Sequence, residues 1–262
     1  MLRHIILYGL YLRANWLSLM QYRLDFAVKN ISGLTLNLVL VAGVGIIFSR
    51  VGEIGGWSFH QVLFIYALGM VCRAVWHLLW VDTLSIGLLV RRGGLDRLLV
   101  RPLNPLFQIM AGYLDDDDWG ELLVGLVGLT VAGRELGLVE HGGQVLLLGL
   151  FVLSGALIYS AIHLAANTTA FWLVSARSLD LLAWELDNFS RYPLNIFGTG
   201  IRFLLTWVVP YGFAGFYPAM AVFGETRWAL LGWATALVGL GAFALAYRFW
   251  LYGLASYQGT GT

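Results

Sequence analysis

The sequence predicts an all-α membrane protein with six transmembrane helices, an N-terminal interfacial helix and a short cytoplasmic helix between spans 2 and 3. The first observation is composition: 59% of the 262 residues are hydrophobic, 12% are charged, and the mean hydropathy is +0.77. Soluble domains carry about a quarter charged residues, so most of this chain is expected to avoid water. The second observation is a series of six long apolar stretches, and the third is the gathering of basic residues between alternate stretches.

Residues 1–30 predict a helix that lies on the membrane surface. Arg3, Arg13, Arg23 and Lys29 are spaced among apolar residues in this segment. Such a composition is typical of helices whose apolar side enters the headgroup boundary.

Residues 31–253 predict a six-span transmembrane domain, and residues 254–262 a short tail. A transmembrane helix needs about 20 mostly apolar residues. The stretches that fit are 31–48, 59–81, 119–132, 145–174, 196–222 and 228–251. The third stretch is the shortest, and it directly follows an acidic run.

The distribution of basic residues sets the expected orientation. Residues 1–30 and the loop 82–118 each hold four of the sixteen Lys and Arg residues. The positive-inside rule places such segments in the cytoplasm. We therefore expect both termini and the loop 82–118 to be cytoplasmic.

The loop between spans 2 and 3 contains the sequence RRGGLDRLLVRPLNPLF. Its two glycines are expected to end one helix, and Pro102 to end the next. Between them, Leu95, Leu98 and Leu99 have the spacing of one helix face. Arginines in an inner loop can serve topology alone, or they can form a contact surface for a partner.

Two stretches carry a resemblance to a known family. GGLDRLLVRPLNPLF and FSRYPLNIFGTGIRFLLTWVVPYGFAGFYPA resemble the membrane subunit of type-2 ABC transporters, and in particular bacterial exporter-type permeases. The resemblance covers nearly the whole chain. The acidic sequence GYLDDDDWG departs from the expected pattern at the start of the third span.

The resemblance implies a permease subunit of an ATP-driven exporter in a bacterial plasma (inner) membrane, surrounded by lipid. It implies pairing with a second permease, identical or sister, and with cytoplasmic ABC ATPase subunits that bind ATP and Mg²⁺. It also implies that the short helix between spans 2 and 3 docks on the ATPase. The residues assigned to this ATPase coupling are Leu95, Asp96, Arg97, Leu98 and Arg101.

The residues themselves predict no catalytic, cofactor or metal site. A Walker A loop needs G-x-x-x-x-G-K-[ST], whereas the one lysine of this chain, Lys29, lies in AVKNIS. The five histidines lack metal-ligand spacing. A net charge of +1 without a basic tail gives no indication of nucleic-acid binding.

The second span carries a polar stripe at helical spacing. A charge inside a membrane is costly and faces protein or a water-filled cavity. We consider two interpretations: the stripe lines a translocation path between two permeases, or Arg73 pairs with a carboxylate while His77 forms hydrogen bonds across helices. The stripe consists of Tyr66, Met70, Arg73, His77 and Trp80.

Other polar positions have more ordinary expected roles. Asp115–Asp118 is expected to be a solvated helix start, and Glu185 and Asp187 to be loop residues. His163 and Asn167, four residues apart, are expected to form interhelical hydrogen bonds.

Pro210 interrupts the fifth span, either as a packing kink or as a hinge that moves during transport. An alternative function, a self-sufficient secondary transporter or channel, would require paired acids inside the membrane or inverted repeats. Neither is evident in the spans, which contain Arg73 and Arg202 but few acids.

Overall fold

The computed structural model describes residues 2–138, 142–173 and 176–259. Over these residues the regular secondary structure is helical, apart from one isolated bridge between Ile54 and Trp57. The all-α class is therefore confirmed. Three predicted segments have an end outside the described residues: residue 1 of the N-terminal helix, residue 174 of the fourth stretch and residues 260–262 of the tail.

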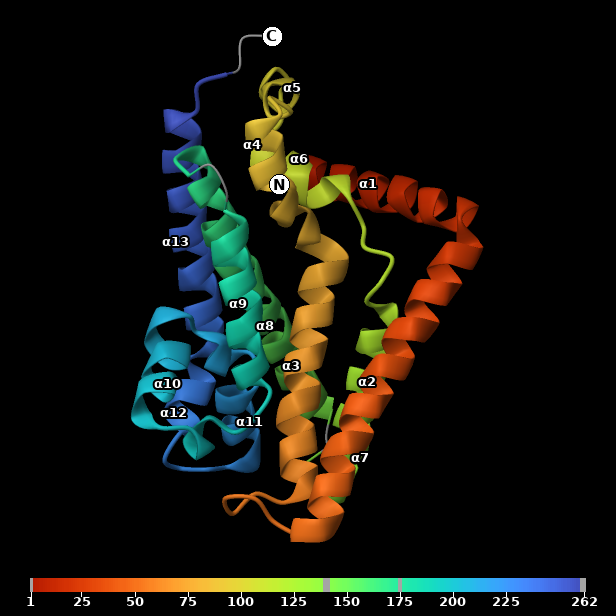
Figure 1. Ribbon diagram of the computed structural model, residues 1–262, viewed down its shortest axis with the longest axis vertical. Helices are drawn as coiled ribbons and strands as arrows, with labels where there is room; N and C mark the ends of the chain where they lie inside the picture. Colours follow the sequence, from red (N-terminus) through yellow and green to blue (C-terminus); the bar gives the residue numbers. More distant parts are fainter. Residues whose placement is uncertain (1, 139–141, 174–175, 260–262) are drawn as a thin grey trace.

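Long helices run along the long axis of the molecule, and one helix runs across them (Figure 1). The crossing helix is α1 (Leu2–Gln21), which meets the others near one end. The long helices are α2 (Arg23–Val51), α3 (Phe59–Trp80), α8 (Gly142–Thr168) and α13 (Thr235–Ser256), accompanied by α7 (Trp119–Glu135) and α9 (Arg177–Ser190).

Helix α3 lies at the centre of the bundle. In the apolar 18-residue segment of the span that contains α3, 78% of the residues are buried, against 11% in the corresponding segment of α2. Because α3 is mostly apolar, it can be enclosed by α7 and α8. Helix α2 instead leaves an apolar outer face exposed, as expected for a helix in contact with lipid or with another chain.

The described residues contain four helices that are long and apolar enough to cross a membrane. These are Arg23–Val51, Phe59–Arg91, Gly143–Phe171 and Thr235–Ser256. A fifth crossing is present if the bent pair Thr199–Val208 and Tyr211–Phe223 is one span. The predicted third span corresponds to α7, which has 17 residues and does not reach this length. The structure thus provides four or five spans, and six remains a prediction.

The first span begins earlier than predicted. Helix α1 ends at Gln21, and α2 starts at Arg23 rather than near residue 31. An ion pair between Lys29 and Asp25, one helical turn apart at 3.3 Å, supports the polar first turns of α2. Arg23, Asp25 and Lys29 therefore all belong to α2, just after the corner where α1 ends.

The fifth stretch is broken where Pro210 was expected to interrupt it. Helix α10 (Thr199–Phe203) continues as a π-helix, η4 (Leu204–Val208), and the chain then bends by 78°. After η5 (Tyr211–Phe213) it resumes as α11 (Phe216–Phe223). Proline has no N–H to continue the ladder, so the stretch 196–222 is interrupted at Pro210, as its sequence predicted.

A short α12 (Ala229–Trp233) precedes α13, so the sixth stretch is also divided. Helices α10, α11 and α12 lie together at one end of the molecule (Figure 1). At the other end lies the α4–α6 hairpin, residues 86–112, together with α1 and the end of α13. Its helices are α4 (Ile86–Arg91), α5 (Asp96–Leu99) and α6 (Pro105–Gly112), and η1 (Val81–Ser85) joins it to α3.

Close contact between α8 and α13 depends on a glycine. A Cβ atom at Gly239 would lie 2.7 Å from the carbonyl oxygen of Ser154 on α8. Two residues later, a Cβ at Gly241 would meet nothing within 4 Å.

We predict that Gly239→Leu destabilises the protein by about 1–3 kcal/mol through overpacking, visible as a lower midpoint of thermal unfolding in detergent. Gly241→Leu is the matched control, and equal midpoints for the two variants would contradict this packing.

Candidate functional site

The tip of the α4–α6 hairpin is anchored by one leucine. Gly93 adopts a left-handed φ of 67°, which turns the chain after α4 as the glycine pair predicted. Leu95 then becomes fully buried in a cluster with residues of α8 and α13. Gln108 of α6 closes the turn by donating hydrogen bonds to the carbonyl oxygens of Leu98 (2.9 Å) and Leu103 (3.0 Å). The partners of Leu95 in that cluster are Ile86, Leu106, Ile109, Ala161, Leu164, Ala246 and Trp250.

The outer surface of the hairpin tip is basic and partly apolar. Arg97 and Arg101 are exposed, as are Arg91 and Arg92, while Asp96 is half-buried. Of the predicted leucine face, Leu95 and Leu98 turn inward. Leu99 does not: it is 42% exposed, because α5 has a single turn and cannot bury three leucines on one face.

All five residues of the α3 stripe contact other parts of the chain. Tyr66 and Met70 pack against Val124 of α7. Arg73 and His77 make ion pairs described below, and Trp80 borders a cavity near α1. The stripe therefore faces α7 and α6 in this structure, and its role as a path remains a prediction.

Arg73 forms a two-point ion pair with Glu121 of α7. The Arg73 Nε donates to Glu121 Oε1 at 2.8 Å, and its Nη2 donates to Glu121 Oε2. Glu121 is only 3% exposed, so each charge would be costly to bury alone. This is the carboxylate pairing that the sequence left open. The partner was missed because Glu121 lies in the first turn of α7, beside the acidic run.

The acidic run before α7 is largely buried rather than solvated. Asp115 and Asp116 are 5% and 8% exposed, so the expectation of a solvated helix start is wrong for them. The Nδ1 of His77 lies 2.7 Å from a carboxylate oxygen of both Asp115 and Asp118. His77 thus draws this loop onto α3, and its partners lie in the loop before α7 rather than on a second helix.

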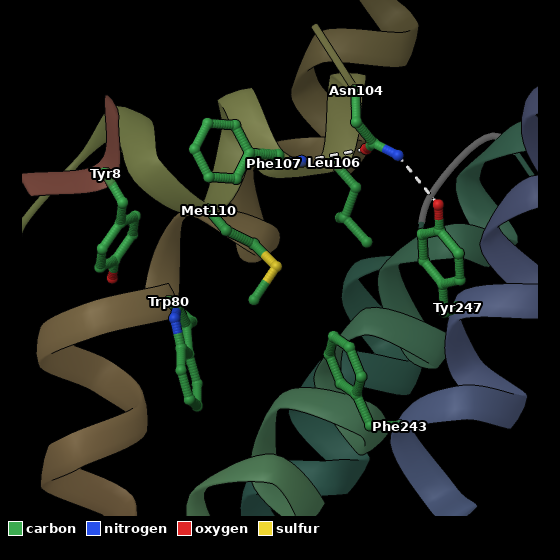
Figure 2. A pocket seen from close by; sticks show the side chains of 8 residues that line it. All are labelled: Tyr8, Trp80, Asn104, Leu106, Phe107, Met110, Phe243 and Tyr247. Atoms are coloured by element: carbon green, nitrogen blue, oxygen red, sulfur yellow. Dashed lines mark hydrogen bonds between the residues drawn. The ribbon is translucent and has the colours of Figure 1, made fainter. Parts of the chain in front are cut away.

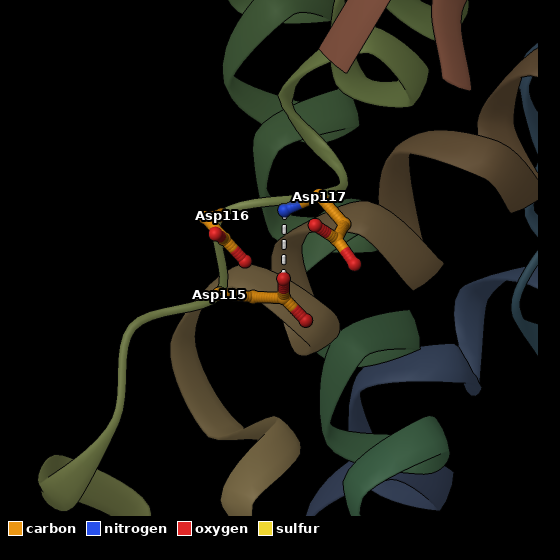
Figure 3. A group of neighbouring side chains, drawn as sticks. All are labelled: Asp115, Asp116 and Asp117. Atoms are coloured by element: carbon orange, nitrogen blue, oxygen red, sulfur yellow. Dashed lines mark hydrogen bonds between the residues drawn. The ribbon is translucent and has the colours of Figure 1, made fainter. Parts of the chain in front are cut away.

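Lys29 of α2 binds the other side of the same run. Its Nζ donates to Asp116 at 2.9 Å and lies 3.5 Å from Asp117. Figure 3 shows the three neighbouring carboxylates, with Asp115 accepting a hydrogen bond from the Asp117 backbone N–H (2.7 Å). Asp115, Asp116 and Asp117 lie close enough together to hold a cation. Two of them already face His77 and Lys29, so the arrangement is explained as a set of ion pairs.

Lys29 and His77 determine the protonation of Asp116 and Asp118. Burial alone would raise the pKa of Asp118, but the hydrogen bond and charge of His77 hold the pKa of this carboxyl below its usual value. Burial likewise opposes ionisation of Asp116, and the hydrogen bond from Lys29 outweighs it, so the pKa of Asp116 is also lowered. Both aspartates are therefore held as anions facing cations.

A second polar cluster joins α8 to α9. The His163 ring stacks on Trp76 of α3 with centroids 4.3 Å apart, and its Nδ1 lies 2.8 Å from Asp180. Asn167 donates to the same carboxylate at 2.9 Å, and the Tyr211 hydroxyl lies 3.3 Å from the His163 Nε2. The predicted interhelical hydrogen bonds of His163 and Asn167 are confirmed.

Asp187 was expected to be a loop residue and is instead buried on α9, at 1% exposure. It accepts hydrogen bonds from the hydroxyls of Tyr159 and Ser190 and faces Arg191 at 3.3 Å. Glu185 is exposed, as expected. The signal that was missed is spacing: Asp180 and Asp187 lie seven residues apart and share a face of an amphipathic helix.

Taken together, this geometry describes a multi-pass helical membrane protein whose central helix is held by buried ion pairs. The chain matches the ABC-2 family transporter protein family over residues 34–261. It therefore belongs to that family and is a membrane permease of an ABC transporter, a component that is generally non-catalytic. No match was found among curated proteins or among solved structures.

The Arg73–Glu121 pair gives a direct stability test. We predict that Glu121→Leu destabilises the protein by about 3–5 kcal/mol, because it leaves the Arg73 guanidinium buried without a partner. Adding Arg73→Met to Glu121→Leu should restore most of the lost stability. The measurement is a double-mutant cycle of unfolding midpoints in detergent. Glu53→Gln, at an exposed position, serves as the control, and additive losses at Arg73 and Glu121 would argue against the pair.

Proposed function

We propose that this permease is one half of an ATP-driven exporter and that its α4–α6 hairpin docks on a separate cytoplasmic ABC ATPase. The observation that carries the proposal is the hairpin tip itself. It presents exposed arginines and the exposed Val100 outward, while Leu95 fixes it to the bundle from within. A basic, partly apolar surface on a rigid support is suited to bind a protein partner.

The position of the tip supports a mechanical role. Leu95 belongs to the same buried cluster as Ala161 and Leu164 of α8 and Ala246 and Trp250 of α13. Helix α4 also continues from α3 through η1. A displacement of the tip would therefore act on three long helices at once, since packed cores transmit strain. In this proposal Asp96, Arg97 and Arg101 contact the ATPase, and Leu95 and Leu98 pass the movement to the bundle.

The proposed orientation in the membrane follows from the basic residues at the hairpin end of the molecule. The hairpin, α1 and the end of α13 lie together (Figure 1). Their basic residues favour the cytoplasmic side, so both termini are proposed to lie in the cytoplasm of a bacterium, with the chain in the inner membrane. Residues 1–30 then provide the interfacial helix and 82–118 the coupling region.

Six spans are proposed by counting α7 and the bent pair as crossings. The 17 residues of α7 cover about 25 Å as a helix, a few ångströms less than the hydrocarbon core of a bilayer. The buried acidic run continues it on one side. A short crossing of this kind is accommodated by local thinning of the bilayer or by tilting of its neighbours.

The path is proposed to form between this chain and a second permease, identical or sister. Helix α2 offers an exposed apolar face for such a partner, including Leu36, Val39 and Ile46. The α3 stripe would line the path in a state in which α7 has moved away from α3. The break at Pro210 would act as the hinge between α10 and α11. This chain is proposed to bind no cofactor of its own, with ATP and Mg²⁺ on the ATPase.

The alternative, a self-sufficient secondary transporter, gains one observation from the structure. Glu121 and Asp187 are buried inside the bundle, and Asp180 is half-buried, although few acids were expected there. Each faces a base or hydrogen-bond donors, as in a structural network. The ATPase experiment below distinguishes the two functions.

Variants of the charged residues at the hairpin tip test the proposed ATPase docking site. We predict that Arg97→Glu, and separately Asp96→Arg, lower co-purification of an ABC ATPase with the tagged chain by about tenfold, equivalent to about 1.4 kcal/mol. The measurement is mass spectrometry of the complex isolated from membranes. Arg50→Glu, an exposed arginine at the far end of α2, is the matched control. Unchanged ATPase recovery in both tip variants would contradict the docking site, and solute transport by the chain alone would support the alternative.

A further inference from the structure

A cavity of about 570 Å³ lies where α1, α3, α6 and α13 meet, beside the α4–α6 hairpin. Figure 2 shows side chains from all four helices directed toward it. The Met110 side chain reaches into its centre, between Trp80 and Leu106. The lining residues are Tyr8, Trp80, Asn104, Leu106, Phe107 and Met110, with Phe243 and Tyr247 on α13.

The wall of this cavity is almost entirely apolar. Its polar atoms are engaged with one another or with the backbone. Asn104 donates to the Tyr247 hydroxyl at 2.9 Å and accepts from the Phe107 backbone N–H at 3.2 Å, and the Tyr8 hydroxyl donates to the Leu79 carbonyl at 3.2 Å. A polar ligand would lose its hydration here without gaining partners. The cavity is therefore suited to a hydrocarbon chain.

The position of the cavity along the bundle indicates where such a hydrocarbon chain would come from. Trp80 is the last residue of α3, and the exposed arginines of the hairpin lie beyond it, toward the same end of the molecule. Tryptophan and tyrosine gather at the boundary between hydrocarbon and headgroups. Helix α1, which supplies Tyr8, crosses the bundle at this level. An apolar cavity at this boundary lies within reach of the acyl chains of one leaflet.

We propose that this cavity binds one acyl chain of a membrane lipid, with the lipid headgroup near the Asn104–Tyr247 side. Its volume lies within the range of about 300–1,000 Å³ that ligand pockets occupy. The site requires only that the protein be embedded in a membrane. It does not depend on coupling to an ATPase, so the two proposals can fail separately.

A second apolar recess provides an internal control. It measures about 530 Å³ and lies among α8, α9, η4 and α13, bordered by Leu182 and Leu245. It has a similar volume but lacks α1 and its aromatic residue. General contact with surrounding lipid would label both recesses alike. A specific site predicts preferential and saturable labelling of the cavity beside α1.

The test uses the purified full chain in liposomes of phosphatidylethanolamine and phosphatidylglycerol. A trace of phosphatidylcholine with a diazirine at the end of one acyl chain is the probe, and labelled residues are mapped by mass spectrometry. We expect labels on Trp80, Phe107 and Phe243, and competition by unlabelled lipid. Met110→Trp, which fills the cavity, should lose this labelling, whereas Leu245→Trp in the other recess should retain it.

Three results would overturn the proposal: equal labelling of both recesses, no label in the cavity beside α1, or undiminished labelling there in a folded Met110→Trp variant. If that variant does not fold, the distribution of labels between the two recesses of the wild-type chain decides the question.

Discussion

A positive charge in the middle of the most buried helix constrains the arrangement of its neighbours. Arg73 lies on α3, and only 16% of its side chain is exposed. Its pairing with Glu121 offsets the cost of burial and sets the register of α7 on α3. One turn further along α3, His77 meets Asp115 and Asp118, so the loop before α7 is drawn against the same helix. The short α7 and its buried acidic entrance follow from these pairs.

The other face of α3 is held by aromatic stacking rather than by charge. Trp76 stacks on His163, which in turn faces Asp180 of α9. Trp184 of α9 packs near the rings of Trp76 and His163. The Arg73 guanidinium lies 5.9 Å from the Trp184 ring centroid. Helix α3 is thus joined to α7, α8 and α9 through polar groups as well as apolar packing. In the proposed function, a force applied at the hairpin reaches this network directly, because α3 continues through η1 into α4.

Much of the helical framework could be predicted from hydropathy and helix breakers. The helices α2, α3, α8 and α13 correspond to predicted stretches, and the turn at Gly93 and the break at Pro210 lie where these residue types predicted them. The acidic partners could not be found in this way, because a hydropathy window records an acid as the end of a span. Whether Glu121 faces water or Arg73 depends on a tertiary contact between residues 48 positions apart, which single-helix patterns do not contain.

The central claim is that the hairpin end of this permease contacts a cytoplasmic ATPase. Val100 at the tip and Leu230 at the opposite end are equally exposed, at 84%, and therefore form a matched pair. The most direct measurement is photo-crosslinking in cells with benzoylphenylalanine in place of either residue. The account predicts an adduct between position 100 and an ABC ATPase and none from position 230. An ATPase adduct from position 230, or none from position 100 in a folded protein, would contradict it.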